Sequence, residues 1–188
     1  MDVWTQFTEY DPSELCDLWE DQGYVPYLEK GAHLVVTGGE PLIHNHHLTS
    51  FIRHFQGRFG FLPIIECETN GTIIPSDLFR DQVRFFNVSP KLSNSGMQRS
   101  KRIVPEVMIY FVSLAHAIFK FVVDTESDLK ELKDDYLVPY KIPLNRLYLM
   151  PASHSRDQLL ALEPKVVDWA KAIGCCYSTR LQLSVWDQ

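Results

Sequence analysis

Short apolar runs alternate with longer stretches of helical periodicity along the chain. The apolar runs are rich in Val, Ile and Phe and stop at glycine, proline or polar residues, which is typical of strands. Strands are therefore predicted at His33–Val36, from Phe61 ("FLPIIECET"), from Val83 ("VRFFNVSPK"), and at Ile118–Val123, Arg146–Ala152 and Tyr177–Trp186. The last assignment rests on the alternation of apolar and polar residues in "YSTRLQLSVW".

Helices are predicted between these strands from cap signals and periodic apolar positions. The segment "DPSEL", Asp11–Leu15, combines an N-cap, a proline in the first turn and an acidic residue, and its helix is expected to end near Gln22. Further helices are predicted at Leu48–Phe55, at Val104–Ala117, from Asp124 ("DTESDLKELKDDY") and at Arg156–Ile173 with Pro164 inside it.

This alternation of apolar strands and helices predicts an α/β fold, either a parallel sheet or an open barrel. No low-complexity linker divides the chain, so one domain is predicted over residues 1–188. In such folds ligands bind at the carboxyl ends of the strands, which draws attention to the loops that follow them.

Composition narrows the class of protein. The 188 residues are 45% hydrophobic and 22% charged, with a net charge of −6, which argues against a nonspecific nucleic-acid or anionic-membrane binder. No apolar run is long enough to span a bilayer, and "MDVWTQFTEYDPSEL" lacks the features of a secretion signal, so a cytoplasmic location is predicted. The four cysteines have no CxxC spacing, which argues against a zinc ribbon.

Four loops that follow predicted strands carry the candidate chemistry: "TGGEP", "ETNGT", "SPKLSNSG" and "LMPASHS". Each one could be no more than a tight turn. Together they would place small or polar residues on one rim and favour a small-molecule site, because glycines let a ligand approach the backbone. The residues of this rim are Thr37, Gly38, Gly39, Glu40, Glu68, Thr69, Asn70, Thr72, Ser89, Lys91 and Ser153.

The segments "LVVTGGEPL", "IECETNGT", "FNVSPKLSNSG", "FKFVV", "LYLMP" and "YSTRLQLSVW" follow one another in this order. With them the chain resembles the 7-carboxy-7-deazaguanine synthases, a family of radical S-adenosylmethionine (SAM) enzymes. The resemblance implies an open, partial (β/α) barrel that uses SAM, a 4Fe–4S cluster and magnesium. It further implies a lyase that converts 6-carboxy-5,6,7,8-tetrahydropterin to 7-carboxy-7-deazaguanine and ammonia on the way to queuosine. A homodimer is a possible assembly of this lyase.

The resemblance also assigns residues to ligands. The SAM-binding positions that it implies are Gly38, Gly39, Glu40, Ser89, Pro90, Lys91, Leu149, Met150, Pro151 and Ala152. Thr37, Glu68 and Asn70 are implied to contact the pterin substrate. No direct contact with nucleic acid or membrane is implied.

One part of the family pattern is absent from the sequence. The family holds its cluster with three cysteines in a CxxxCxxC-like loop after the first strand, and Cys16, Cys67, Cys175 and Cys176 do not have that spacing. We therefore expect the first strand, the cluster loop and the magnesium ligand to precede Met1 in a longer protein, and the 188 residues alone to be inactive. The alternative is an inactive SAM- or pterin-binding paralogue or a truncated fragment. No catalytic residue and no metal ligand is assigned.

Overall fold

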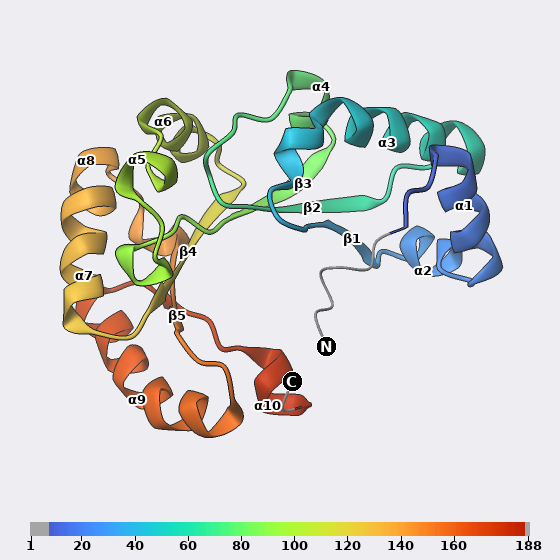
Figure 1. Ribbon diagram of the computed structural model, residues 1–188. Coiled ribbons are helices and arrows are strands. Elements are labelled where there is room, and N and C mark those ends of the chain that lie inside the picture. The colour runs from blue at the N-terminus through green and yellow to red at the C-terminus, as the bar shows by residue number, and fades with distance from the viewer. Residues whose placement is uncertain (1–7, 187–188) are drawn as a thin grey trace.

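The computed structural model describes residues 8–186. Within this range six parallel strands form one sheet in the order β1-β2-β3-β4-β5-β6. The strands are β1 (His33–Val36), β2 (Ile64–Thr69), β3 (Val83–Val88), β4 (Ala117–Val123), β5 (Leu147–Pro151) and β6 (Cys176–Tyr177). Because parallel strands in sequential order are joined by right-handed crossovers, the connecting helices lie on one side of the sheet. The predicted α/β fold is confirmed, as an open, curved sheet (Figure 1).

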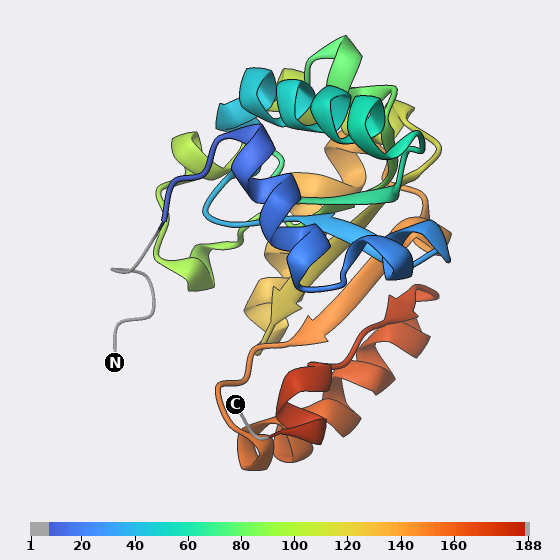
Figure 2. The same ribbon diagram turned by 90° about the vertical axis from the view of Figure 1, so that its right-hand side faces the viewer.

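Helices line the convex outer side of this sheet (Figure 1). The α-helices are α1 (Pro12–Asp21), α2 (Val25–Glu29), α3 (Asn45–Phe59), α4 (Asp77–Arg80), α5 (Arg99–Arg102), α6 (Pro105–Ser113), α7 (Glu126–Leu132), α8 (Val138–Tyr140), α9 (Arg156–Ile173) and α10 (Leu181–Val185). Short 3-10 helices are η2 (Pro41–His44), η3 (Ser93–Ser95) and η5 (Leu144–Arg146), and η4 (Lys133–Leu137) is a π-helix. Helices α1 and α3 lie side by side (Figure 2). None of the helices within the described range is long and apolar enough to cross a membrane.

The two faces of the sheet differ in chemistry, as β4 shows. Phe119 and Phe121 are fully buried, whereas Lys120 between them is half-buried, because side chains alternate across a strand. The apolar side chains face the helices and form the core, in which Phe86 packs edge-on against Phe111 of α6. We call the opposite side the inner face; it carries polar residues such as Glu66 of β2.

Two helix boundaries differ from the prediction. The helix predicted at Leu48–Phe55 extends over Asn45–Phe59, and the one predicted at Val104–Ala117 ends at Ser113. Ala117 instead begins β4. The sequence pattern did not show this boundary, because a run of apolar residues fits a buried helix and a buried strand equally well.

The prediction of a last strand at Tyr177–Trp186 is wrong. Only Cys176–Tyr177 pairs with β5, and Leu181–Val185 is helix α10. The neighbouring strand ends at Pro151, which has no N–H to donate, and its carbonyl accepts a hydrogen bond from Arg180 Nε at 2.9 Å. Beyond Tyr177 the chain has no strand to pair with among residues 8–186, and it continues as helix α10.

Candidate functional site

Glu40 ties together the loops that follow β1 and β2. One carboxylate oxygen accepts hydrogen bonds from Thr69 Oγ1 at 2.8 Å and Leu42 N at 3.1 Å, and the other accepts from Asn70 N at 2.7 Å. A carboxylate has about four lone-pair directions, so three protein donors leave one for a further donor such as an ammonium group. The structure therefore brings the "TGGEP" and "ETNGT" loops together, as predicted.

The glycines of these loops serve two different purposes. Gly71 has φ +76°, and a Cβ there would lie 2.9 Å from Val88 Cγ1, so this turn is packed directly against β3. Gly38 has φ +136°, yet a Cβ on Gly38 or Gly39 would meet no atom within 4 Å. The "GG" pair thus leaves open space above the backbone, which suits the approach of a ligand.

Three predicted substrate residues lie at the end of the inner face. Thr37 Oγ1 donates to Glu68 Oε2 at 3.4 Å, and Lys120 Nζ pairs with Glu68 Oε1 at 3.6 Å. Asn70 uses its side-chain oxygen within the turn, where it accepts from Thr72 N and Thr72 Oγ1 at 2.9 and 2.6 Å. Glu68 is therefore an oriented, exposed carboxylate, while Asn70 has only its amide N–H groups to offer a ligand.

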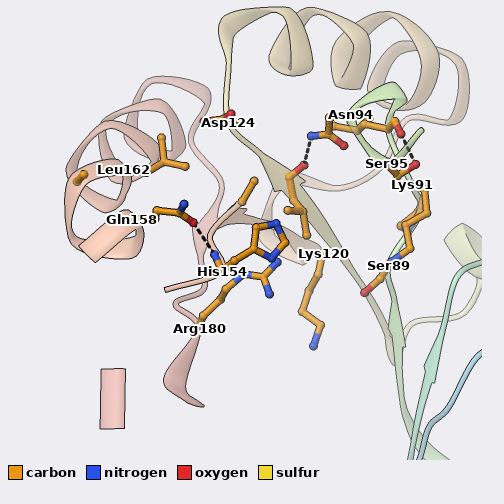
Figure 3. Close-up of a pocket in the computed structure, with 15 residues that line it drawn as sticks. Ser89, Lys91, Asn94, Ser95, Lys120, Asp124, His154, Gln158, Leu162 and Arg180 are labelled. Atoms are coloured by element: carbon orange, nitrogen blue, oxygen red, sulfur yellow. Dashed lines mark hydrogen bonds between the residues drawn. The ribbon is translucent and has the colours of Figure 1, made fainter. Parts of the chain in front are cut away.

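A cavity of ≈ 800 Å³ lies at the carboxyl ends of β3, β4 and β5, beside the start of α9 (Figure 3). It brings the "SPK" residues Ser89, Pro90 and Lys91 together with Ala152, which lie far apart in the sequence. The rest of the lining consists of Leu92, Asn94, Ser95, Lys120, Val122, Asp124, His154, Gln158, Ala161, Leu162 and Arg180. His154 is held at the rim by its backbone N–H, which donates to Gln158 Oε1 at 2.9 Å (Figure 3).

The cavity has an excess of positive charge. Burial and the nearby charge of Arg180 lower the pKa of Lys91, while the charges of Glu40 and Glu68 act in the opposite direction. Burial also lowers the pKa of Arg180. No carboxylate of residues 8–186 lies within ion-pair distance of the Lys91 ammonium. Two half-buried cations that repel each other favour the binding of an anionic group.

Three named relatives are similar in sequence over about four fifths of this chain. A protein named 7-carboxy-7-deazaguanine synthase from Pyrobaculum aerophilum is 32% identical over 154 residues, which are 82% of this chain and 65% of the relative. Proteins of the same name from Hyperthermus butylicus and Rhodopirellula baltica are each 31% identical, over 81% and 80% of this chain and 64% and 60% of their own length. The resemblance to 7-carboxy-7-deazaguanine synthases is confirmed. The chain spans less than two thirds of these relatives, and no model of a known family matches it.

A solved structure with bound S-adenosylmethionine has a similar fold. The crystal structure of Streptococcus suis SuiB bound to S-adenosylmethionine superposes with a TM-score of 0.54 at 15% identity, covering 88% of this chain and 42% of SuiB. At this identity the similarity shows the fold alone. The partial barrel that the 7-carboxy-7-deazaguanine synthase resemblance implied is thus the observed architecture.

The structure separates the four residues that were predicted to form a SAM-binding loop after β5. Leu149 is fully buried in the core, and its carbonyl accepts from Ser178 N at 2.9 Å. Pro151 is also buried, with its carbonyl bonded to Arg180. Only Ala152 lines the cavity. The strand alternation sends the side chains of Leu149 and Pro151 to the helix-covered face, away from the cavity lining.

Other predicted residues lie outside the cavity lining. Met150 is half-buried between the two core residues of β5, and Ser153, which was expected on the rim, is only 1% exposed. The "GGE" residues Gly38 and Gly39 and the carboxylate of Glu68 are not part of the lining either. They belong to the adjoining end of the inner face, to which Lys120 connects the cavity.

Two cationic residues of the site were missed in the sequence. Lys120 is the only charged residue within "AIFKFVV", and a charge that interrupts an apolar strand was an available signal. Arg180 had no such signal, because its segment was assigned to a strand. Its position depends on the turn after β6 and on its hydrogen bond to Pro151.

The cysteines do not fit a 4Fe–4S cluster. All four lie within residues 8–186, where no group of three Cys, His, Asp or Glu residues is placed to hold a metal ion. Cys16 and Cys67 are buried in separate parts of the fold, and burial, with the charges of Glu40 and Glu68, raises the pKa of Cys67 to about 12. Burial and the neighbouring Cys176 raise the pKa of Cys175 to about 11. Cys67 and Cys175 are therefore poor sources of the thiolates that a cluster requires.

Proposed function

We propose that this chain binds SAM and a pterin as the ligand-binding part of a 7-carboxy-7-deazaguanine synthase. In this role it would serve the conversion of 6-carboxy-5,6,7,8-tetrahydropterin to 7-carboxy-7-deazaguanine and ammonia in 7-deazapurine biosynthesis. The named relatives at 31–32% identity support the family, and one structural observation supports the ligand. That observation is the cavity in which the "SPK" loop meets Ala152 between cationic side chains.

The chemistry of this cavity suits SAM. Its methionine end carries a carboxylate, which Lys91 and Arg180 would bind, and its nucleoside end needs directed polar groups, which Asn94 and Gln158 supply. Glu40 retains one acceptor direction for the amino group of SAM. In a complete synthase, bound SAM would supply the 5′-deoxyadenosyl group for the radical reaction.

The inner face beside the cavity suits the pterin. Glu68 is an exposed carboxylate that Thr37 and Lys120 hold in place, and a carboxylate can accept a pair of N–H groups from an aminopyrimidinone ring. Lys120 carries the positive charge that the pterin carboxylate requires. No step of the ring contraction is assigned to these residues.

We further propose that residues 1–188 by themselves bind SAM without cleaving it, because their four cysteines do not fit a cluster. This property would be shared by an inactive paralogue, which remains the alternative function. The two proposals differ in the product that the cell makes. A part of a synthase would contribute to 7-carboxy-7-deazaguanine synthesis, whereas a paralogue would bind the ligands without contributing to it.

Calorimetric titration of the chain with SAM tests the binding site. We expect saturable binding that Lys91→Ala weakens at least tenfold, because the variant removes a charge-assisted contact. Lys30→Ala, at an exposed lysine after α2, is the control and should bind as the wild type does. Absence of SAM binding, or equal loss in both variants, would contradict the assignment. Release of 5′-deoxyadenosine after anaerobic treatment with iron, sulfide and a reductant would contradict binding without cleavage.

A further inference from the structure

The backbone of the "SPK" loop is held from behind the cavity at one carbonyl group. Tyr136 Oη donates to the carbonyl oxygen of Lys91 at 2.7 Å, and Arg102 Nη1 donates to the same oxygen at 3.3 Å. A carbonyl oxygen has two lone pairs, so both are used. The two donors come from different elements, the π-helix η4 and α5.

A buried ion pair connects these donors to a second point of the loop. Arg102 is 5% exposed, and its Nη2 lies 2.7 Å from Glu131 Oε1. Glu131 in turn accepts from Ser93 N at 3.0 Å and from the Ser93 hydroxyl. Between these two points Leu92 is buried in the core. The loop backbone is therefore fixed on the side away from the cavity, while the Lys91 side chain lines the cavity.

Glu131 of α7 and Tyr136 of the π-helix η4, which directly follows α7, belong to one continuous helical segment that contacts both Ser93 and Lys91. Glu131 and Tyr136 are five residues apart, which in a regular α-helix would place them about 140° apart around the axis. A π-turn bonds residue i to residue i+5 and brings such a pair toward the same side. Single π-turns of this kind are rare and frequently lie at functional sites. Here Glu131, in the last turn of α7, and Tyr136, in η4, both bond to the loop at residues 91 to 93.

We propose that Tyr136 and Arg102 are positioning residues that clamp the Lys91 carbonyl so that the Lys91 ammonium is held in the cavity near Arg180. This inference rests on the proposed function, in which Lys91 binds the carboxylate of SAM. Neither side chain lines the cavity, so both act through Lys91.

The clamp has a physical purpose before the ligand arrives. Lys91 and Arg180 repel each other across the cavity, and burial disfavours both charges, so a free loop would move the lysine toward solvent. Glu40 and Glu68 attract Lys91 from the other side, but neither reaches it as an ion pair. Fixing the loop in advance lowers the ordering cost of binding, which increases affinity for the anion.

Tyr136→Phe tests the clamp because it removes one hydroxyl and keeps the buried ring. Tyr140→Phe is the matched control, since its ring centroid lies 6.4 Å from that of Tyr136 and its hydroxyl has no hydrogen-bond partner among residues 8–186. The first measurement is made without ligand: acetylation of the Lys91 amine is followed by mass spectrometry as a function of pH, and the pH at the midpoint of the curve is determined. The second is the SAM dissociation constant.

We expect Tyr136→Phe to raise the Lys91 midpoint toward that of an exposed lysine and to weaken SAM binding roughly three- to tenfold, as for the loss of one buried hydrogen bond. Tyr140→Phe should change neither value. If Tyr136→Phe lowers only the melting temperature and leaves both values at the wild-type level, the residue is merely structural and the proposal is wrong.

Arg102→Lys provides a second, independent variant if Tyr136→Phe does not fold. A lysine keeps the charge opposite Glu131 but cannot donate to Glu131 and the Lys91 carbonyl in the geometry of a guanidinium. It should shift the Lys91 midpoint in the same direction. The clamp and the proposed function can fail separately. If the variants shift the Lys91 midpoint but the wild type does not bind SAM, the clamp is supported and the proposed function is rejected.

Discussion

At the scale of single residues, close packing of loops against strands determines which glycines are required. Gly71 has a positive φ and no room for a Cβ beside Val88, whereas Gly57 lies inside α3 with a helical φ and open space around it. The same residue type is therefore needed at one position and unfavourable at the other.

This contrast gives a prediction with opposite signs. Gly71→Ala should lower the free energy of unfolding by about 2 kcal/mol, because the left-handed φ and the contact with Val88 both disfavour a methyl group. Gly57→Ala should raise it by about 0.5–1 kcal/mol, because alanine favours the helix. Urea unfolding followed by circular dichroism measures both. Equal destabilisation by the two variants would show that the turn at Gly71 relaxes.

At the scale of elements, helix α1 is attached to the barrel mainly through aromatic packing. Trp19 of α1 lies edge-on to Phe51 and Phe55 of α3, with ring centroids 5.3 and 6.2 Å apart. Arg58 of α3 also forms ion pairs with Asp17 and Glu20 of α1, but these are at the surface, where ion pairs contribute little.

We therefore expect Trp19→Ala to lower the free energy of unfolding by about 2 kcal/mol or more, since it removes a large apolar contact. Arg58→Met should have a much smaller effect, and that effect should decrease further in high salt. Chemical unfolding at low and high ionic strength compares the two variants. A larger loss for Arg58→Met than for Trp19→Ala would mean that charge pairing holds α1 in place.

At the scale of the whole molecule, a polar network on the inner face joins the first three strands. Glu66 of β2 pairs with His33 Nδ1 of β1 and accepts from Asn87 Nδ2 of β3 at 2.8 Å. Burial raises the pKa of Glu66, but the hydrogen bonds from His33 and Asn87 and the charges of His33 and Lys120 outweigh it, and the pKa lies below its ordinary value of 4.5. The ionised carboxylate thus stabilises the fold.

The sign of the pH dependence follows from this lowered pKa. The stabilisation by Glu66 is complete above the unfolded-state pKa, near 4.5, and is lost as the pH falls through the lower folded-state pKa. The difference in unfolding free energy between the wild type and Glu66→Gln should therefore be larger at pH 6 than at pH 3. Urea titrations at several pH values measure it, with the exposed Glu29→Gln as control. A difference independent of pH would contradict a role for the ionised group.

The sequence alone determined the alternation of strands and helices, the positions of the first five strands, and that small and polar residues follow the strands. Local patterns carry this information, because periodicity and turn chemistry involve residues a few positions apart. The same patterns failed for α10, whose alternating apolar residues fit a strand that has no partner to pair with. The resemblance to a known family added the ligands and most of the site residues.

Only the tertiary structure decided which side chains meet. Glu40 and Asn70 are 30 residues apart, and Tyr136 and Lys91 are 45 apart, and nothing in their local sequence shows these contacts. Strand register sends Leu149 into the core and Lys120 toward the site. The physical reason is that a contact between distant segments depends on the register and curvature of the entire sheet, which many residues fix together and no single motif contains.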